Sequence, residues 1–343
     1  MGSDEQLPER AGVEAAAERA AAPAAWRKWS TRLLPWVAAG VAALAILGKY
    51  PPGTIASEMS EGDLFAMIPY GVALLGVGIL IVSSSDYAIV RGLAASPGLS
   101  LPSFSQVVRA RAGMSLLGVI GYGAGVGGLG VWIARVTGCT VGLASGGVLY
   151  LMSADLVSVS LVTSLSIWIG VVDVAASLRI GAPLLALVLL ALKLGVFEGA
   201  VDRRALPAVL RPWALISRGR ALSIVALRTV NIGWLTLCSW GGAQAFGLDV
   251  PLWAWAAVFP VVLLVGSMPV NVAGFGAVQG AWLLFEPWAR TGEQVLAFSL
   301  LWQLLCLVGV LLRGAPFVGS VFRDVGVTVE RPIQPIFDED VFD

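Results

Sequence analysis

Four long apolar runs, at about residues 64–90, 139–172, 222–246 and 295–318, constrain this chain more than any other feature. At 1.5 Å of rise per helical residue, each run is long enough to cross the roughly 30 Å hydrocarbon core of a bilayer. With 57% hydrophobic and only 13% charged residues, a chain of 343 residues cannot supply the surface of soluble domains. We therefore predict an all-α polytopic membrane protein.

Two further apolar regions, at about 107–136 and 251–288, are interrupted by glycine and proline, as in GYGAGVGGLG at 121–130. Each glycine costs roughly 1 kcal/mol of helix propensity, so these regions predict pairs of broken or re-entrant helices. With shorter spans near 33–49 and 183–200, we expect about six full transmembrane helices plus the two broken pairs. If each broken region instead crosses the membrane twice, the number of spans is higher.

The distribution of charge predicts the orientation. Basic clusters fall on one side of the predicted membrane, and the acidic turn at 58–63 and Asp249 fall on the other. By the positive-inside rule, both termini lie on the cytoplasmic side of a bacterial-type cytoplasmic (inner) membrane. We expect a disordered Ala-rich tail at 1–25, one multi-pass membrane domain at 26–322, and a polar tail at 323–343. The basic clusters are Arg27, Lys28 and Arg32; Arg91, Arg109 and Arg111; and Arg203, Arg204, Arg211, Arg218 and Arg220.

The composition excludes several classes of function. The chain contains no histidine, the commonest general base and metal ligand near neutral pH. Its three cysteines, Cys139, Cys238 and Cys306, lie far apart in apolar sequence and form no metal or disulfide pattern. The formal net charge is zero, so no bulk field favours nucleic acid. We expect no catalytic site, no metal, no cofactor and no nucleic-acid partner.

An internal repeat relates the two interrupted regions. Val126–Val131 (VGGLGV) matches Val272–Ala277 (VAGFGA), and ARVTG at 134–138 matches ARTG at 289–292. Three predicted crossings separate the copies, so halves at roughly 64–200 and 201–318 would be inverted relative to one another, as in many transporters. Chance similarity between glycine-rich apolar segments is the alternative.

The same segments carry a resemblance to a known family. SMPVNVAGFGAVQGAWLLF followed by RTGEQVLAFSLLWQLLCLVGVLL resembles the transmembrane region of lysylphosphatidylglycerol synthases, a flippase-like module that also occurs as free-standing proteins. A weaker match covers Arg91 and the run from Gly127 through Arg135 to Asp155. The resemblance implies a lipid flippase, and because no aminoacyl-transferase domain follows, we expect no lipid aminoacylation. Gln279 departs from the family, which usually has Glu at this position.

Charged and polar residues inside apolar runs are the candidate site residues, because a charge at the bilayer centre needs a partner or a purpose. Asp155 is expected to pair with Arg135 or Arg228, the alternative being that it lies near an interface. Arg228 and Asn231 share one helical face on which a lipid phosphate could bind. The alternative readings are snorkelling of Arg228 to the surface and, for the glycines, close helix contact. Asp86 lies near a predicted span end and needs no special role. The candidate headgroup-binding set is Arg135, Asp155, Arg228, Asn231, Asn271, Gly274, Gly276 and Gln279.

We therefore expect a non-enzymatic lipid transporter that binds a phospholipid or polyprenyl-phosphate headgroup, with membrane lipids as its partners. A charged phosphate cannot cross hydrocarbon without substitute solvation. The alternative is a non-transporting membrane partner of a lipid-modifying enzyme or glycosyltransferase. A membrane-embedded transferase is disfavoured, because the chain has no histidine and no clustered acidic pair.

Overall fold

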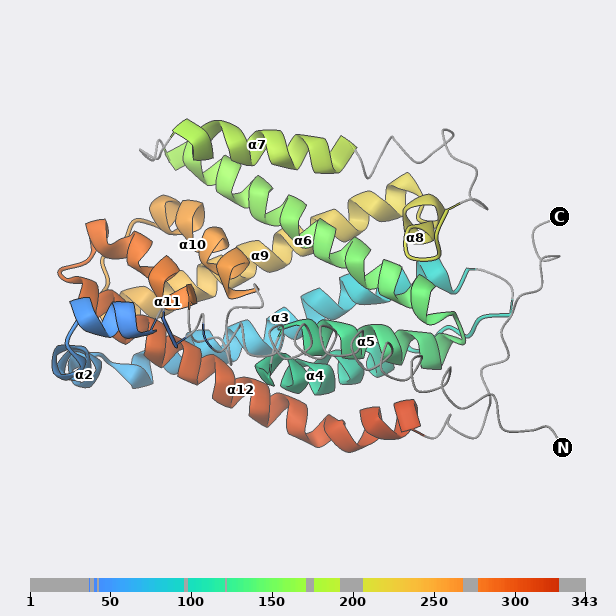
Figure 1. Cartoon of the computed structure of the whole chain (residues 1–343), viewed down its shortest axis with the longest axis horizontal. Helices are drawn as coiled ribbons and strands as arrows, with labels where there is room; N and C mark the ends of the chain where they lie inside the picture. Colours follow the sequence, from blue (N-terminus) through green and yellow to red (C-terminus); the bar gives the residue numbers. More distant parts are fainter. Residues whose placement is uncertain are drawn as a thin grey trace, which may run out of the picture.

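The computed structural model describes residues 37, 40–41, 43–95, 98–120, 122–170, 176–191, 206–267 and 277–326, and every regular element among them is a helix (Figure 1). Four of these helices are long and apolar enough to cross a membrane: α3 (Leu64–Leu93), α6 (Val141–Gly170), α9 (Arg218–Phe246) and α12 (Gly292–Gly326). They confirm the four predicted apolar runs. The chain thus has the helices of a multi-pass membrane protein.

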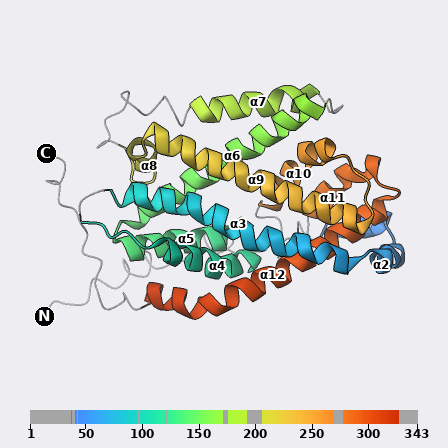
Figure 2. The same cartoon turned by 180° about the vertical axis from the view of Figure 1, so that it is seen from behind.

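The long helices lie side by side, α3 and α12 running in one direction and α6 and α9 in the other, with α3 and α9 adjacent in both views (Figures 1 and 2). Glycine permits the closest approaches between them. A Cβ atom at Gly241 of α9 would lie 2.2 Å from the ring of Tyr70 on α3, and one at Gly242 would lie 2.4 Å from the ring of Trp302 on α12. These small residues therefore bring the helix backbones together, as is common in membrane bundles.

Each interrupted region contains more than one described helix. The first contains two helices that lie against one another, α4 (Phe104–Ile120) and α5 (Tyr122–Thr137), and the glycine run expected to interrupt the helix lies from residue 122 onward inside α5. A Cβ atom at Gly125 of α5 would lie 2.9 Å from the backbone nitrogen of Gly118 on α4, so no larger residue fits there. The second consists of α10 (Leu252–Gly266), α11 (Ala277–Trp282) and the 3-10 helix η2 (Leu283–Trp288). We call these the first and second hairpins.

Aromatic rings fill the space around the second hairpin. Trp255 of α10 stacks on Phe285 of η2 with ring centroids 4.2 Å apart. Trp282 contacts both of these rings, and Phe298 contacts Trp255 and Trp282. Trp255 and Phe285 are fully buried. This region is the larger of two main apolar cores, and the other joins α3, α5, α6 and α9.

Several shorter elements differ from the predictions. The expected acidic turn before the second span is mostly a helix, α2 (Pro52–Glu61), which proline can begin because it needs no backbone donor at that position. The predicted span at 183–200 begins earlier, as α7 (Ala176–Ala191), and its second half lies outside the described residues. A five-residue helix, α8 (Arg211–Leu215), lies within the basic loop. Helix α12 continues to Gly326, so the predicted tail from 323 begins too early.

Charges separate between the two ends of the long helices. The end at which α3 stops and α9 starts carries mainly arginine, and the opposite end carries mainly acids (Figure 1). The arginines are Arg91, Arg109, Arg135, Arg211, Arg218, Arg220 and Arg323, with Asp324 beside them. The acids are Glu58, Glu61, Asp63, Asp249, Glu286 and Glu293, with Lys49, Arg179 and Arg290 among them.

Candidate functional site

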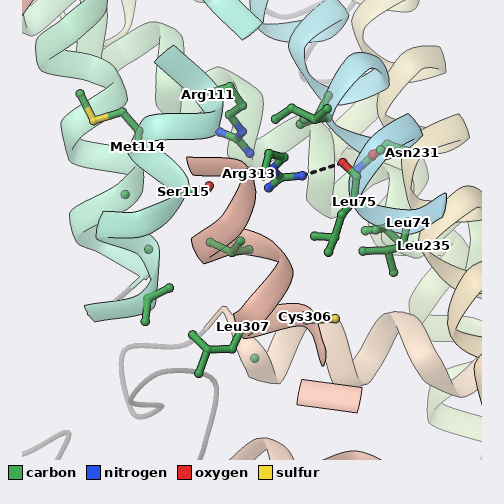
Figure 3. Close-up of a pocket in the computed structure, with 18 of the residues that line it drawn as sticks. Leu74, Leu75, Arg111, Met114, Ser115, Asn231, Leu235, Cys306, Leu307 and Arg313 are labelled. Carbon is green, nitrogen blue, oxygen red and sulfur yellow. Dashed lines mark hydrogen bonds between the residues drawn. The ribbon is translucent and has the colours of Figure 1, made fainter. Parts of the chain in front are cut away.

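A cavity of about 380 Å³ lies among α3, α4, α5, α9 and α12 (Figure 3). Many lining residues come from the central parts of three of the four long helices: positions 74–82 of α3, positions 231 and 235 of α9, and positions 303–313 of α12. The inner ends of both hairpins also reach it, through Gly118 and Gly125 of the first and Gly266 of the second. The cavity is therefore central along the direction in which the long helices run.

Two arginines enter this cavity from different helices. Arg111 of α4 and Arg313 of α12 lie with their guanidinium groups next to one another (Figure 3), and their charges repel. Arg313 donates from Nη1 to the backbone oxygen of Leu75 at 2.8 Å, while its buried Nε has no hydrogen-bond partner among the described residues. Two like charges in one apolar cavity favour an anion between them.

A network of ion pairs continues from the cavity into the protein. Asp86 of α3 is fully buried and contacts Arg111 at 3.6 Å from Nε. The other oxygen of Asp86 accepts a hydrogen bond of 2.5 Å from Arg228 of α9, which also donates to both oxygens of Asp155 on α6 at 3.0 and 3.1 Å. The chain of contacts Arg111–Asp86–Arg228–Asp155 thus links α4, α3, α9 and α6.

Neutral polar groups complete the lining. Asn231 lies one turn after Arg228, is 8% exposed, and its side chain has no hydrogen-bond partner in the part of the chain that the structure describes. Ser115 and Gln303 also line the cavity. The other lining residues are small or apolar, apart from Cys306: Leu74, Leu75, Gly78, Ile79, Val82, Met114, Gly118, Val119, Gly125, Val126, Leu235, Gly266, Leu307 and Val310.

The structure brings together only part of the predicted set. The Arg228–Asp155 pair is confirmed as one of the two expected alternatives, and Asn231 lines the cavity as its helical face suggested. The snorkelling alternative for Arg228 is wrong, because the residue is 3% exposed and paired on both sides. Asn271, Gly274 and Gly276 lie outside the described residues.

Two predicted residues lie away from the cavity. Arg135 is in the last turn of α5, ten residues or about 15 Å along the helix from Gly125. Gln279 is buried on α11 but does not line the cavity. The position of Arg135 follows from the hairpin geometry, because it lies at the outer end of α5, away from the α5 residues that line the cavity.

Three important residues were missed by the sequence analysis. The interpretation that Asp86 needs no special role is wrong, because it is fully buried between Arg111 and Arg228. Arg111 was grouped with a basic loop, although it lies within α4. Arg313 lies within the apolar run at 295–318, so the reasoning applied to Asp155 could have identified it.

No group of histidine, cysteine, aspartate or glutamate that could hold a metal exists among the described residues. The three cysteines are free, and burial raises the pKa of the Cys139 thiol in the connection between α5 and α6, which makes it a poor nucleophile. Neither a family model nor a curated protein matches this sequence significantly.

Proposed function

We propose that this protein is a lipid transporter whose central cavity binds the anionic headgroup of a phospholipid or polyprenyl phosphate. The observation that supports this most strongly is the placement of Arg111 and Arg313 in a cavity at the middle of the long apolar helices. If these helices cross a bilayer, the two cations lie near its mid-plane. That is where a headgroup in transit most needs substitute solvation.

The order of elements supports alternating access between two inverted halves. Each half contains a long helix, a broken hairpin and a second long helix, in the order α3, α4–α5, α6 and then α9, α10–η2, α12. The two hairpins start from opposite ends of the molecule (Figures 1 and 2). We infer that they re-enter the membrane from opposite sides and that Gly138 and Gly292 occupy equivalent turns before α6 and α12. Inverted repeats with broken helices near the mid-plane are typical of secondary transporters.

The charge asymmetry supports one orientation in the membrane. The arginine-rich end, at which α3 stops and α9 starts, would face the cytoplasm by the positive-inside rule. On that orientation the first hairpin enters from the cytoplasmic side. Arg111 would then come from the cytoplasmic hairpin, and Arg313 from the helix that follows the opposite one.

The size of the cavity favours a headgroup without its acyl chains. At roughly 30 Å³ per water molecule, 380 Å³ holds about a dozen waters. This is the scale of a phosphate ester with a small alcohol, and the lipid tails would stay in the bilayer. Substrate tails need no protein binding site there, because hydrocarbon already solvates them.

A vesicle assay tests the proposal. Purified protein is reconstituted into liposomes that contain fluorescent phosphatidylglycerol, and the label that reaches the outer leaflet is measured with a membrane-impermeant quencher. We expect Arg111→Gln and Arg313→Gln to slow translocation at least about tenfold, because each removes a charge-assisted hydrogen bond. The matched control is Arg109→Gln, on the same helix but exposed, which we expect to leave the rate unchanged.

The alternative function is that of a membrane partner for a lipid-modifying enzyme. In such a protein, the paired charges inside the bundle would only hold the helices together. Under that function, wild-type protein would leave the label where it started. Folded arginine variants with the rate of wild type would count against the headgroup site.

A further inference from the structure

The charges around the cavity do not balance. Three guanidinium groups, those of Arg111, Arg228 and Arg313, share this region with two carboxylates, Asp86 and Asp155. Within the ranges that the structure describes, no acidic residue pairs with Arg313, and its only hydrogen bond goes to a backbone oxygen. These five described side chains therefore sum to a net charge of +1, and together they are called the cluster.

An unbalanced charge in an apolar environment is costly, and a ligand of opposite charge removes that cost. One negative charge brings the cluster to zero. A phosphodiester carries one negative charge, whereas a phosphomonoester approaches two at neutral pH because its second pKa is about 6. A zwitterionic headgroup adds no net charge and would leave the imbalance in place.

Donor groups for one phosphate are already present. Arg111 approaches Asp86 with Nε, at 3.6 Å, and lines the cavity beside Arg313 (Figure 3). Arg313 donates from Nη1 to the Leu75 backbone oxygen, and its other nitrogens donate to no described residue. The Asn231 side-chain amide also makes no hydrogen bond to described residues. Guanidinium groups suit phosphate oxygens because they donate in a planar fork.

We propose that the cavity selects lipids whose phosphodiester headgroup has a net charge of −1. The excess of three arginines over two aspartates determines this preference. The inference rests on the proposed function, because it assumes that the cavity is the headgroup site. The largely apolar lining and the central position favour a lipid over a soluble diester.

Binding in detergent tests selectivity without transport. The intact protein in a non-ionic micelle at pH 7.5 is titrated with dihexanoyl phosphatidylglycerol, phosphatidic acid or phosphatidylcholine, and the shift in melting temperature is recorded. We expect phosphatidylglycerol to bind at least about tenfold more tightly than phosphatidylcholine, the usual worth of one interaction with a charged group. Equal shifts with the two lipids would overturn the proposal. So would equally tight binding of the soluble glycerophosphoglycerol, which would assign the site to a free diester.

Three variants test the charge count itself. Arg313→Gln brings the cluster to zero, and we expect the preference for phosphatidylglycerol over phosphatidylcholine to disappear. Arg313→Lys keeps the charge and should keep the preference with weaker binding. Asp155→Asn raises the charge to +2 while Asp86 still pairs with Arg228, and should shift the preference to phosphatidic acid. An unchanged preference in Arg313→Gln would contradict the proposal, even if Asp155→Asn failed to fold.

The selectivity and the transport proposal can fail separately. Selective binding of phosphatidylglycerol without any translocation of its labelled form in vesicles would contradict the transport proposal. It would leave the proposed headgroup selectivity intact. If labelled phosphatidylglycerol and phosphatidylcholine cross at the same rate, the transport proposal is supported and the proposed headgroup selectivity is overturned.

Discussion

The two hairpins occupy comparable places in the chain, yet their surroundings are chemically opposite. The first, α4–α5, meets at Gly118 and Gly125 and carries Arg111 into the cavity. The second, α10–η2, packs the rings of its own Trp255, Trp282 and Phe285 together and against Phe298 of α12. A glycine contact leaves room beside it, whereas stacked rings fill the space. The first hairpin thus provides charge and space, and the second provides rigidity.

The largest effect is expected where the first hairpin is closest. Gly125→Val places a branched side chain where even a Cβ atom would lie 2.9 Å from the Gly118 backbone, so the two helices cannot keep their contact. We expect loss of most monodisperse protein on size-exclusion chromatography. Gly127→Val is the matched control, because a Cβ atom there meets nothing within 4 Å. Equal yields of the two variants would show that the hairpin is not held by this glycine contact.

The second hairpin should be sensitive to the loss of a ring. Trp255→Ala removes a fully buried side chain that stacks on Phe285, and we expect a loss of about 3–5 kcal/mol in the free energy of unfolding. Urea unfolding in micelles measures it. Trp253→Ala, two residues away and 43% exposed, should cost far less. Similar costs for the two tryptophans would argue against a rigid aromatic core.

The ion pairs beside the first hairpin should differ in strength according to burial. Asp86→Asn leaves Arg111 without its carboxylate and Arg228 with only one, and we expect a loss of about 3 kcal/mol. Asp155 is 27% exposed, so Asp155→Asn should cost only about 1 kcal/mol. Urea unfolding in micelles measures the loss in free energy of unfolding for both variants. The reverse order would mean that Asp155 carries the network.

The smallest effect is expected at the outer end of the second hairpin. Glu286 lies 4.0 Å from Lys49, and both side chains are well exposed. Water screens such a pair, so Glu286→Gln should change the free energy of unfolding by less than about 0.5 kcal/mol. The amide can still accept the hydrogen bond that Tyr50 donates to Glu286. A larger loss in the free energy of unfolding would show that the rigid part of the second hairpin reaches its exposed outer end.

Local sequence features predicted what depends on a single segment. The long helices followed from run length and apolar composition, whereas the glycines at 123–130 were expected to interrupt a helix and instead lie within α5. The Arg228–Asp155 pair was expected because each residue is a charge inside an apolar run. These properties are set within about thirty residues of chain.

Pairing across the bundle was harder to predict. Asp86 is 142 residues from Arg228 along the chain, and nothing near Asp86 in the sequence shows which helix will face it. Its position near a predicted span end indicated no special role, but the packing of α3 against α9 buries it completely. The position of Arg135 likewise depends on which end of α5 reaches the cavity. Such contacts follow from tertiary packing and not from local pattern.

The bond between Arg313 and position 75 has an evolutionary consequence. Arg313 donates to a main-chain oxygen, which any amino acid at position 75 would supply. The Leu75 side chain instead occupies the space beside Gly309, where an added Cβ atom would lie 1.8 Å from it. In related sequences, we therefore expect a smaller residue at position 75 to accompany a larger residue at position 309. The arginine at position 313 should be retained whichever residues occupy these two positions.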